Sequence, residues 1–337
     1  MKIGVLGAGS WGVALTTLLS GNGHDVTVWS IDKEEVKMLD TEREHKTKLA
    51  GVKLDDSVKV TNDIKEAIEG AKLLVFVVPS PFIRSTAKAA APYVTSEQVL
   101  VNVSKGIEEA TLMTLTDVIE DEIKGATVGV LSGPSHAEEV GRRMPTTVVA
   151  GAKSKEIAEL IQDVFMSDFF RVYTSPDVLG IELGGALKNV IALAAGIGDG
   201  LGCGDNAKAA LITRGIAEIT RLGVKMGGQM STFGGLSGIG DLIVTCASQH
   251  SRNRRAGYLM GQGKSYKEAM DEVKMVVEGV YSAKAALALS KKYDVEMPIV
   301  EMINKILFED YDCRECMRLL LTRMKTSESK DFIWDEK

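Results

Sequence analysis

Lys188 lies in an apolar, glycine-rich stretch, L-G-G-A-L-K-N-V-I-A at 183–192, where a charged residue needs a reason. Its ammonium group either extends to the surface or serves a function, and sequence spacing alone leaves both interpretations open. Burial, or a neighbouring cation such as Lys105, would lower the pKa of this group from about 10.4 towards roughly 7–8. The group would then suit proton exchange with a hydroxyl or carbonyl oxygen during hydride transfer.

A second group of residues could bind an anion. Residues 251–255 read S-R-N-R-R, a local cationic cluster in a chain whose formal net charge is -6. Arginine side chains match the geometry of phosphate and carboxylate groups, although most charge runs are simply solvated. The preceding G-G-L-S-G-I-G-D at 234–241 favours a loop against a ligand, because closely spaced glycines allow unusual backbone angles and close approach.

The motif G-A-G-S-W-G follows a predicted strand and opens a predicted helix, a context that indicates a dinucleotide site. Gly7 would allow the tight turn, Gly9 would let the backbone approach a pyrophosphate, and Gly12 would let helix and strand pack closely. The helix N-terminus adds free N–H groups and the positive end of its dipole. Asp32, after the second predicted strand, either binds the ribose hydroxyls of NAD or caps the next helix.

The elements that must position these residues form two groups. Apolar runs alternate with amphipathic stretches to about residue 175, which predicts an α/β Rossmann domain with a doubly wound, mostly parallel sheet. We expect strands at 2–6, 25–29, 73–78, 99–103, 128–131, 146–150 and around 172–173, and helices at 11–20, 33–39, 64–69 and 112–123. Beyond residue 176, helical spacing at 178–201, 207–222, 266–274, 281–291 and 299–308 predicts an all-α C-terminal domain. The expected domains are therefore 1–176 and 177–325, followed by a frayed tail at 326–337.

The composition of the 337 residues, 45% apolar and 26% charged, is that of a globular protein long enough for two domains. The acidic balance argues against nucleic acid as a main partner. Cys313 and Cys316 form a C-x-x-C, interpreted as two reduced thiols one helical turn apart rather than as a metal or redox site. With neither a secretory signal nor an apolar run of membrane-spanning length, we expect a cytoplasmic location and no membrane insertion.

These motifs carry a resemblance to a known family. The pieces G-A-G-S-W-G, V-P-S, S-K-G, S-G-P-S-H-A-E-E, L-G-G-A-L-K-N-V, G-x-G-D-L, S-R-N-R-R and V-V-E-G-V occur in this order. In this the chain resembles NAD(P)-dependent glycerol-3-phosphate dehydrogenases of the bacterial type, to about residue 320, and L-K-N-V and S-R-N-R-R are specific to them. The resemblance implies an NAD or NADP cofactor and the reversible reduction of dihydroxyacetone phosphate to sn-glycerol 3-phosphate, which supplies phospholipid synthesis. Related enzymes are commonly dimers, but no feature of the sequence establishes a homodimer.

The resemblance also implies roles for individual residues. Lys188 would be the general acid/base at the C2 oxygen, Lys105 would bind substrate and cofactor, and Asp241 would orient Lys188. The other residues implied to contact substrate are Gly133, Ser135, Asn189 and Thr245, with Ser251, Arg252 and Asn253 at the phosphate. The residues implied to contact the cofactor are Gly7, Gly9, Ser10, Trp11, Gly12, Ile31, Asp32, Lys105, Ala137, Arg252, Val276 and Glu278. No catalytic histidine is required, because the family often has another residue at the position of His136.

Three positions depart from the family pattern, all on the cofactor side of the cleft. Ile31 stands where many relatives have arginine or histidine, residues 48–50 read K-L-A rather than Y-L-P, and Pro81 replaces a polar residue. The sequence therefore leaves the choice between NADH and NADPH open, and Ile31 tilts it towards tolerance of NADH. It also leaves feedback inhibition open.

Two other functions compete with this interpretation. A 3-hydroxy-acid dehydrogenase of the related Rossmann-plus-helical group would also use a lysine but would bind a carboxylate or acyl group. A non-catalytic dinucleotide sensor would need the Rossmann glycines but neither Lys188 nor the cluster at 251–255.

Overall fold

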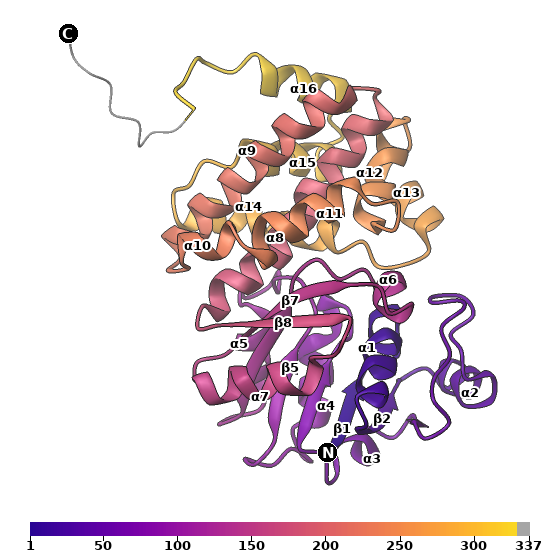
Figure 1. Ribbon diagram of the computed structural model, residues 1–337. Coiled ribbons are helices and arrows are strands. Elements are labelled where there is room, and N and C mark those ends of the chain that lie inside the picture. Colours follow the sequence, from indigo (N-terminus) through magenta and orange to yellow (C-terminus); the bar gives the residue numbers. More distant parts are fainter. Residues whose placement is uncertain (329–337) are drawn as a thin grey trace.

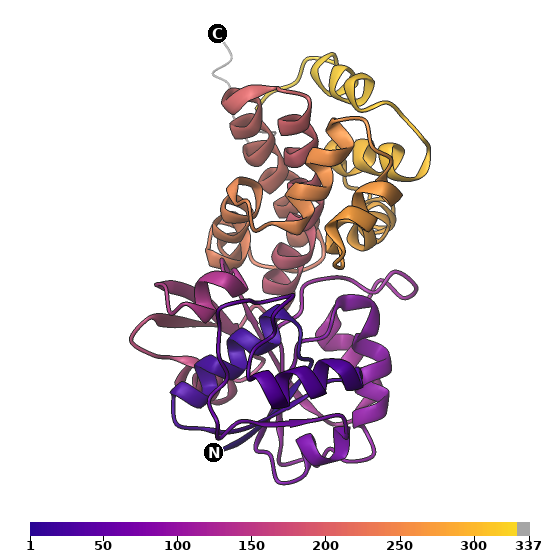
Figure 2. The same ribbon diagram turned by 90° about the vertical axis from the view of Figure 1, so that its right-hand side faces the viewer.

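The structure, a computed structural model, describes residues 1–328 and consists of a sheet-containing N-terminal part and an all-helical C-terminal part (Figure 1). The two parts are stacked on one another when the molecule is turned by 90° (Figure 2). The predicted tail at 326–337 lies mostly outside the described residues. This is the predicted fold class, a Rossmann domain followed by a helical domain.

One eight-stranded sheet has the order β3-β2-β1-β4-β5-β6-β7-β8. All neighbouring strands are parallel except β6 and β7, which are antiparallel. The strands are β1 (Lys2–Leu6), β2 (Asp25–Trp29), β3 (Lys59–Thr61), β4 (Leu73–Phe76), β5 (Val99–Asn102), β6 (Thr127–Ser132), β7 (Thr146–Gly151) and β8 (Phe170–Ser175). The sequence analysis missed β3, because an edge strand of three residues offers too few positions for a periodic pattern.

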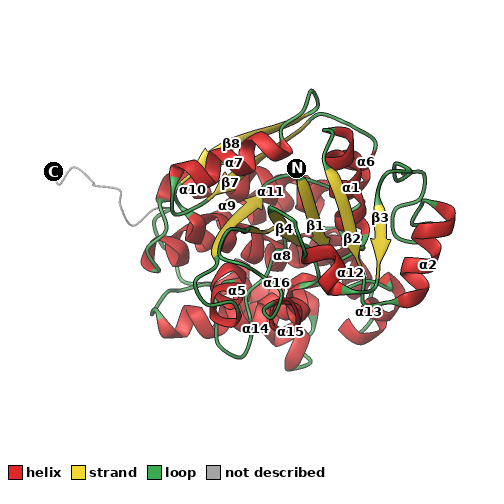
Figure 3. Cartoon of the chain, turned by 90° about the horizontal axis from the view of Figure 1, so that it is seen from below, coloured by secondary structure: helices red, strands yellow, loops and turns green. Residues whose placement is uncertain are grey.

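Helices cover both faces of this sheet, which is why its strands read as continuous apolar runs. Along β4, Val75 packs into the core beneath α1 and α7, whereas Leu74 and Phe76 pack into the core beneath α3, α4 and α5. Successive side chains of a strand point to opposite faces. Figure 3 shows α1 and α7 on one side of the strands and α5 on the other. The helices are α1 (Ser10–Gly21), α2 (Lys33–Glu42), α3 (Ile64–Ile68), α4 (Ile83–Ala90), α5 (Leu115–Glu122), α6 (Ala137–Gly141) and α7 (Lys155–Phe165).

The helical part is built around α8 (Val178–Gly200), which is buried along nearly all of its length. Glycines let its neighbours approach: a Cβ added at Gly196 would overlap the carbonyl oxygen of Arg254 on α12. The helices around it are α9 (Gly204–Lys225), α10 (Met230–Phe233), α11 (Asp241–Ala247), α12 (Arg252–Gly261), α13 (Tyr266–Val273), α14 (Glu278–Lys292), α15 (Pro298–Phe308) and α16 (Cys313–Leu321). Cys313 and Cys316 both lie on α16 as free thiols, so their predicted helical setting is confirmed.

The segment expected to be a loop is helical, and the cationic cluster also begins a helix. Residues 236–240 form a π-helical turn that leads directly into α11, and residues 252–255 form the first turn of α12. The glycines of the first segment do not form an open loop. They let its backbone lie close to the backbone of α8 and to that of Phe233. The expected start of the helix at 112 was wrong, because Leu112 has a φ of 62° and the helix begins at Leu115.

Two described stretches, Val178–Gly200 and Met230–Ala247, have the length and apolar composition of a membrane span. The first is α8, and 89% of its apolar window is buried inside the protein, as expected for a core helix. The second is interrupted at Gly238, whose φ and ψ of -98° and -105° separate α10 from α11. Burial within the helical part therefore accounts for the apolar character of α8.

Candidate active site

The glycine motif forms an open cradle at the carboxyl end of β1. Gly7 has a φ of 130°, and a Cβ there would lie 3.0 Å from the backbone of Val77. A Cβ on Gly12 would overlap the carbonyl oxygen of Gly7, whereas a Cβ on Gly9 would meet nothing within 4 Å. The first turn of α1 has no side-chain cap and no acidic residue. The free N–H groups and the open space at Gly9 fit a pyrophosphate, at the point where the strand order reverses between β1 and β4.

Asp32 caps α2, with Oδ1 accepting hydrogen bonds from the backbone N–H of Glu34 at 2.9 Å and of Glu35 at 3.3 Å. The capping interpretation therefore holds, and the cap leaves Asp32 exposed at the end of β2. Ile31 is 82% exposed beside it. Contact of either residue with a ribose remains a prediction.

A buried carboxylate holds two lysines together where the sheet meets the helical part. Asp241 is 1% exposed, and its Oδ1 accepts a hydrogen bond from Lys188 Nζ at 2.6 Å. Its Oδ2 accepts one from Lys105 Nζ, also at 2.6 Å. Lys188 donates further to Thr245 Oγ1 at 2.6 Å, and Lys105 to the carbonyl oxygen of Gly133 at 2.9 Å. The structure thus brings five of the predicted site residues into one hydrogen-bonded cluster.

Glycines on α8 make this cluster sterically possible. A Cβ on Gly184 would lie 2.5 Å from the carbonyl oxygen of Ser237, in the turn before Asp241. A Cβ on Gly185 would lie 3.4 Å from Cγ of Lys105 and 3.0 Å from Oγ of Ser132. The L-G-G-A stretch therefore lets α11 and the loop after β5 reach Lys188 from two sides.

The environment shifts the pKa of each charged group in the cluster. Burial, reinforced by the cation of Lys105 and opposed by the attraction of Asp241, lowers the pKa of Lys188 to about 8. Burial alone would raise the pKa of Asp241, but Lys105 and Lys188 together hold it below its usual value. A lysine with a pKa near 8 can both donate and accept a proton close to neutral pH.

The cationic cluster at 251–255 divides into residues with separate tasks. Ser251 caps α12, its Oγ accepting a hydrogen bond from the N–H of Arg254 at 3.2 Å. Arg254 is committed to Asp199, with a 2.7 Å distance between Nε and Oδ2, and Arg255 is exposed. Arg252 instead reaches the carbonyl oxygen of Val276 at 3.2 Å and lies within the electrostatic influence of Glu278. Arg252 is therefore the arginine of this cluster that is placed to meet an anionic ligand beside Glu278.

Asn253 and Asn189 form a buried hydrogen bond between helices. Asn253 Nδ2 donates to Asn189 Oδ1 at 2.9 Å, and Asn253 Oδ1 accepts from the N–H of Gly279 at 2.8 Å. The pair joins α12, α8 and the start of α14, a structural role that the sequence did not reveal. Asn189 Nδ2 also donates to the carbonyl oxygen of Gly185 at 3.4 Å, so the hydrogen-bonded chain extends along α8.

Glu278 joins the two parts of the protein. Its carboxylate accepts hydrogen bonds from the N–H of Ser80 at 3.0 Å and from Ser80 Oγ at 2.5 Å. Gly106, next to Lys105, lies against the same serine, and a Cβ there would be 3.6 Å from Glu278 Oε2. The sequence analysis did not predict a role for Ser80, although the V-P-S motif that contains it was a usable signal.

The remaining predicted residues border these groups. Ser135 Oγ donates to the carbonyl oxygen of Gly133 at 3.0 Å. Ala137 is buried as the first residue of α6, and Ser10 and Trp11 begin α1. A separate cavity of about 110 Å³ lies between α8, α9, α15 and α16. It is lined mostly by apolar side chains and includes neither the two lysines nor Asp241 nor Arg252, so we place the site at the lysine cluster.

Comparisons with known proteins agree over both parts of the chain. The sequence model of the N-terminus of NAD-dependent glycerol-3-phosphate dehydrogenases matches residues 2–158, and the model of their C-terminus matches residues 177–318. The glycerol-3-phosphate dehydrogenase (NAD(P)+) of Agathobacter rectalis is 60% identical over 333 residues, 99% of each chain. That of Bacillus subtilis is 52% identical over 335 residues, 98% of this chain and 97% of the other. The solved structure of glycerol-3-phosphate dehydrogenase from Coxiella burnetii has a TM-score of 0.93 and 35% identity, covering 96% of this chain and 99% of that one.

Proposed function

The chain belongs to the NAD(P)-dependent glycerol-3-phosphate dehydrogenase family, and we propose that Lys188 is the general acid/base of its reaction. The reaction interconverts dihydroxyacetone phosphate and sn-glycerol 3-phosphate. The observation that carries the proposal is that Lys188 is buried, donates hydrogen bonds to both Asp241 and Thr245, and has its pKa lowered to about 8. A merely solvated lysine would have neither the burial nor the two short contacts.

In the direction of reduction, Lys188 donates a proton to the C2 oxygen as a hydride reaches C2. In oxidation the neutral amine removes that proton. Lys105, 2.6 Å from the other oxygen of Asp241, adds positive charge where the oxygen becomes negative in the transition state. Asp241 orients both ammonium groups through hydrogen bonds made before substrate arrives, so little reorganisation is needed during the reaction.

The phosphate end of the substrate is assigned to Arg252 at the N-terminus of α12, with Ser251, Asn253 and Asn189 around it. Free N–H groups at the helix start add to the positive potential of the guanidinium group. A held phosphate positions C2 against the reacting groups, so binding energy at the non-reacting end lowers the barrier at the reacting end. Gly133, Ser135 and Thr245 are assigned to the rest of the substrate.

The cofactor is assigned to the cradle at Gly7, Gly9 and Gly12, with the contacts predicted from the resemblance as its further partners. The bound nicotinamide supplies the hydride in reduction and accepts it in oxidation. Glu278, held by Ser80 between the two parts, is partly buried beside the loop that carries Lys105. This position supports its predicted contact with the cofactor, and Val276 and Ala137 are assigned to the cofactor with it.

The division into a cofactor domain at 1–176 and a substrate domain at 177–325 remains part of this proposal. So do the supply of glycerol phosphate to phospholipid synthesis, the cytoplasmic location and a homodimer. Loss of the strand pattern after β8 and the start of α8 at Val178 support the boundary.

The test is oxidation of NADH and of NADPH with dihydroxyacetone phosphate, followed at the nicotinamide absorbance, for the wild type, Lys188→Ala and Arg252→Ala. We expect Lys188→Ala to lower kcat by about 10²- to 10⁴-fold, the usual contribution of a positioned acid or base. Arg252→Ala should mainly raise KM for the substrate. Wild-type turnover of unphosphorylated dihydroxyacetone at the same efficiency would contradict the phosphate assignment, and a 3-hydroxy-acid panel would follow.

The same assay decides the cofactor preference. The exposed Ile31 offers no positive charge to a 2′-phosphate, so we expect NADH to be used at least as well as NADPH. A strong preference for NADPH would show that another cation, such as the exposed Lys33, serves the 2′-phosphate.

A further inference from the structure

His136 brings an unused polar atom to the lysine cluster. Its Nε2 is buried without a hydrogen-bond partner, one of six such side-chain atoms among residues 1–328. A buried polar group without a partner destabilises the protein, so such an atom calls for a ligand or another explanation. The roles assigned above to the lysines, Asp241 and Arg252 do not use it.

The surroundings of His136 place it between the two ends of the substrate site. It follows the Gly133–Ser135 turn, whose first carbonyl oxygen binds Lys105, and the pKa of its ring responds to Lys188, Lys105 and Asp241 and to the backbone of Val244 on α11. On the other side its ring centroid lies 6.0 Å from that of His250, which directly precedes Ser251 at the start of α12. The imidazole therefore borders both the lysine cluster and the segment that carries Arg252.

The imidazole is neutral at physiological pH. Burial, together with the cations of Lys188 and Lys105, lowers the pKa of His136 to about 4 against the attraction of Asp241. A neutral ring neither competes with Arg252 for a phosphate nor stabilises the developing charge at C2 as an ammonium group does. It suits a neutral polar group of the ligand, with which Nε2 can pair as donor or as acceptor according to its tautomer.

We propose that His136 binds the hydroxyl group on C1 of dihydroxyacetone phosphate and makes the enzyme selective for this substrate. The inference rests on the substrate proposed above. The substrate has three polar ends: the phosphate faces Arg252, the C2 oxygen faces the lysines, and the C1 hydroxyl is left. Ser135 Oγ is paired with the carbonyl oxygen of Gly133, and Thr245 Oγ1 is paired with Lys188 and Asp241. Ser132 Oγ also has no partner, but it lies against the backbone of α8 at Gly185. His136 is thus a specificity-determining residue of the reaction and takes no part in its proton transfer.

The test compares dihydroxyacetone phosphate with acetol phosphate, which has a methyl group in place of the C1 hydroxymethyl group. We expect wild type to prefer dihydroxyacetone phosphate by at least about 10-fold in kcat/KM, because a site built for a hydroxyl rejects the analogue without it. His136→Phe should lower kcat/KM for dihydroxyacetone phosphate by about 10- to 100-fold and leave that for acetol phosphate nearly unchanged. His136→Gln, which keeps a hydrogen-bonding group, should restore part of the preference.

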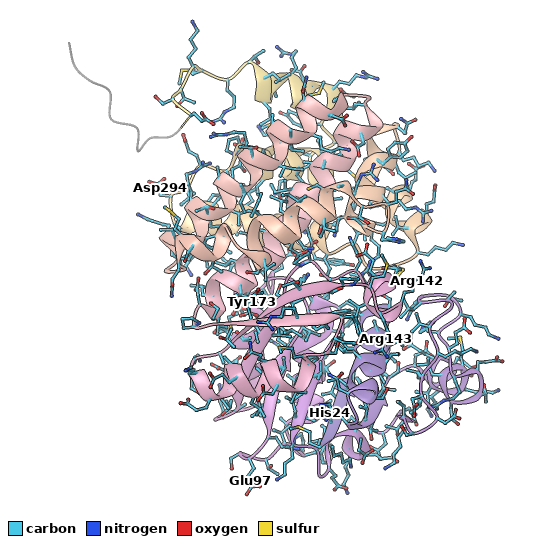
Figure 4. The ribbon with its side chains drawn as sticks, in the orientation of Figure 1. His24, Glu97, Arg142, Arg143, Tyr173 and Asp294 are labelled. Atoms are coloured by element: carbon cyan, nitrogen blue, oxygen red, sulfur yellow. The ribbon has the colours of Figure 1, made fainter. Side chains whose placement is uncertain are left out.

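The control is the same substitution at a remote histidine. His24 lies at the far end of the Rossmann domain from the helical part (Figure 4), so His24→Phe should leave the ratio between the two substrates unchanged. Equal losses on both substrates in His136→Phe would reveal a structural role and overturn the proposal. An equal use of both substrates by wild type would overturn it without any variant. If Lys188→Ala keeps its turnover instead, the proposed function fails, a result that is separate from either outcome.

Discussion

The side chain of Lys188 illustrates how one residue acquires its chemistry from burial and neighbours. Its position on a buried helix removes water from the ammonium group, which favours the neutral amine. Asp241 opposes this effect at 2.6 Å, while Lys105 reinforces it from the other carboxylate oxygen. The balance brings the pKa of Lys188 to about 8. The result is a group that changes its charge close to neutral pH.

The pH dependence of the two reaction directions should follow from this value. Reduction needs the protonated lysine, so its kcat/KM should fall as pH rises through about 8. Oxidation needs the neutral amine, so its kcat/KM should rise through the same range. Steady-state rates in both directions between pH 6 and 10 measure both limbs.

Lys105→Met sharpens this prediction, because it removes the neighbouring cation that lowers the pKa of Lys188. Its overall rate should drop, but the falling limb of the reduction profile should also move to higher pH. A limb that stays near pH 8 in Lys105→Met would show that another group titrates there.

At the scale of elements, α8 and α12 carry the residues proposed for the two ends of the substrate site and contact one another through their backbones. Lys188 lies on α8, and Arg252 begins α12. Gly196 on α8 and Gly257 on α12 lie at the contact, since a Cβ on either would overlap a carbonyl oxygen of the other helix. Their spacing therefore sets how far the proposed phosphate site at Arg252 lies from Lys188.

Two substitutions on the same helix test this contact. Gly196→Ala should destabilise the protein by about 1–3 kcal/mol through overpacking, and should raise KM for the phosphorylated substrate by displacing Arg252. Gly198→Ala is the matched control, because a Cβ there meets nothing within 4 Å. It should stabilise the helix by about 0.5–1 kcal/mol. Thermal unfolding and substrate KM distinguish the two, and equal effects would disprove the backbone contact.

At the scale of the whole molecule, a buried carboxyl group joins the Rossmann sheet to the core helix of the helical part. Glu182 on α8 accepts hydrogen bonds from the N–H of Thr116 at 2.9 Å and from Asn102 Nδ2 at 3.2 Å, and Thr116 Oγ1 also binds it. Burial raises the pKa of Glu182 to about 7, against the effect of these hydrogen bonds. The connection between the two parts is therefore sensitive to pH near neutrality.

The sign of this effect follows from proton binding. The folded protein keeps a proton on Glu182 between pH 4.5, the ordinary value, and about 7, whereas the unfolded chain releases it. The stabilisation is full below pH 4.5 and is lost as pH rises through about 7. Glu182→Gln cannot lose a proton, so its melting temperature relative to wild type should rise by a few degrees between pH 5 and 8. Thermal melts across this range measure the difference.

Glu218, buried with a pKa also raised to about 7, is present in both proteins and cancels from the comparison. A difference in melting temperature that stays constant with pH would show that Glu182 remains ionised in the folded state.

The sequence by itself determined the order of the elements and the residues with chemical potential. Apolar runs buried on both faces predict the strands, and the G-x-G-x-x-G after β1 predicts the cofactor cradle, because both depend on local composition and spacing. Long elements such as α8 and α9 were predicted nearly to their ends for the same reason. The three-residue β3 and the helical start at Arg252 escaped prediction, since neither has enough periodic residues to stand out.

The tertiary structure alone decided which of these residues meet. Lys188, Lys105 and Asp241 are 53 to 136 residues apart in the chain, so no local pattern shows that one carboxylate binds both lysines. No local pattern shows the hydrogen bonds between Ser80 and Glu278 or the unpaired nitrogen of His136 either. The different tasks of Ser251, Arg254 and Arg252 also depended on packing, because Asp199 and the carbonyl oxygen of Val276 reach the two arginines only in the folded protein. Distances between residues remote in sequence are set by packing, and the charge state of a buried group is set by those distances.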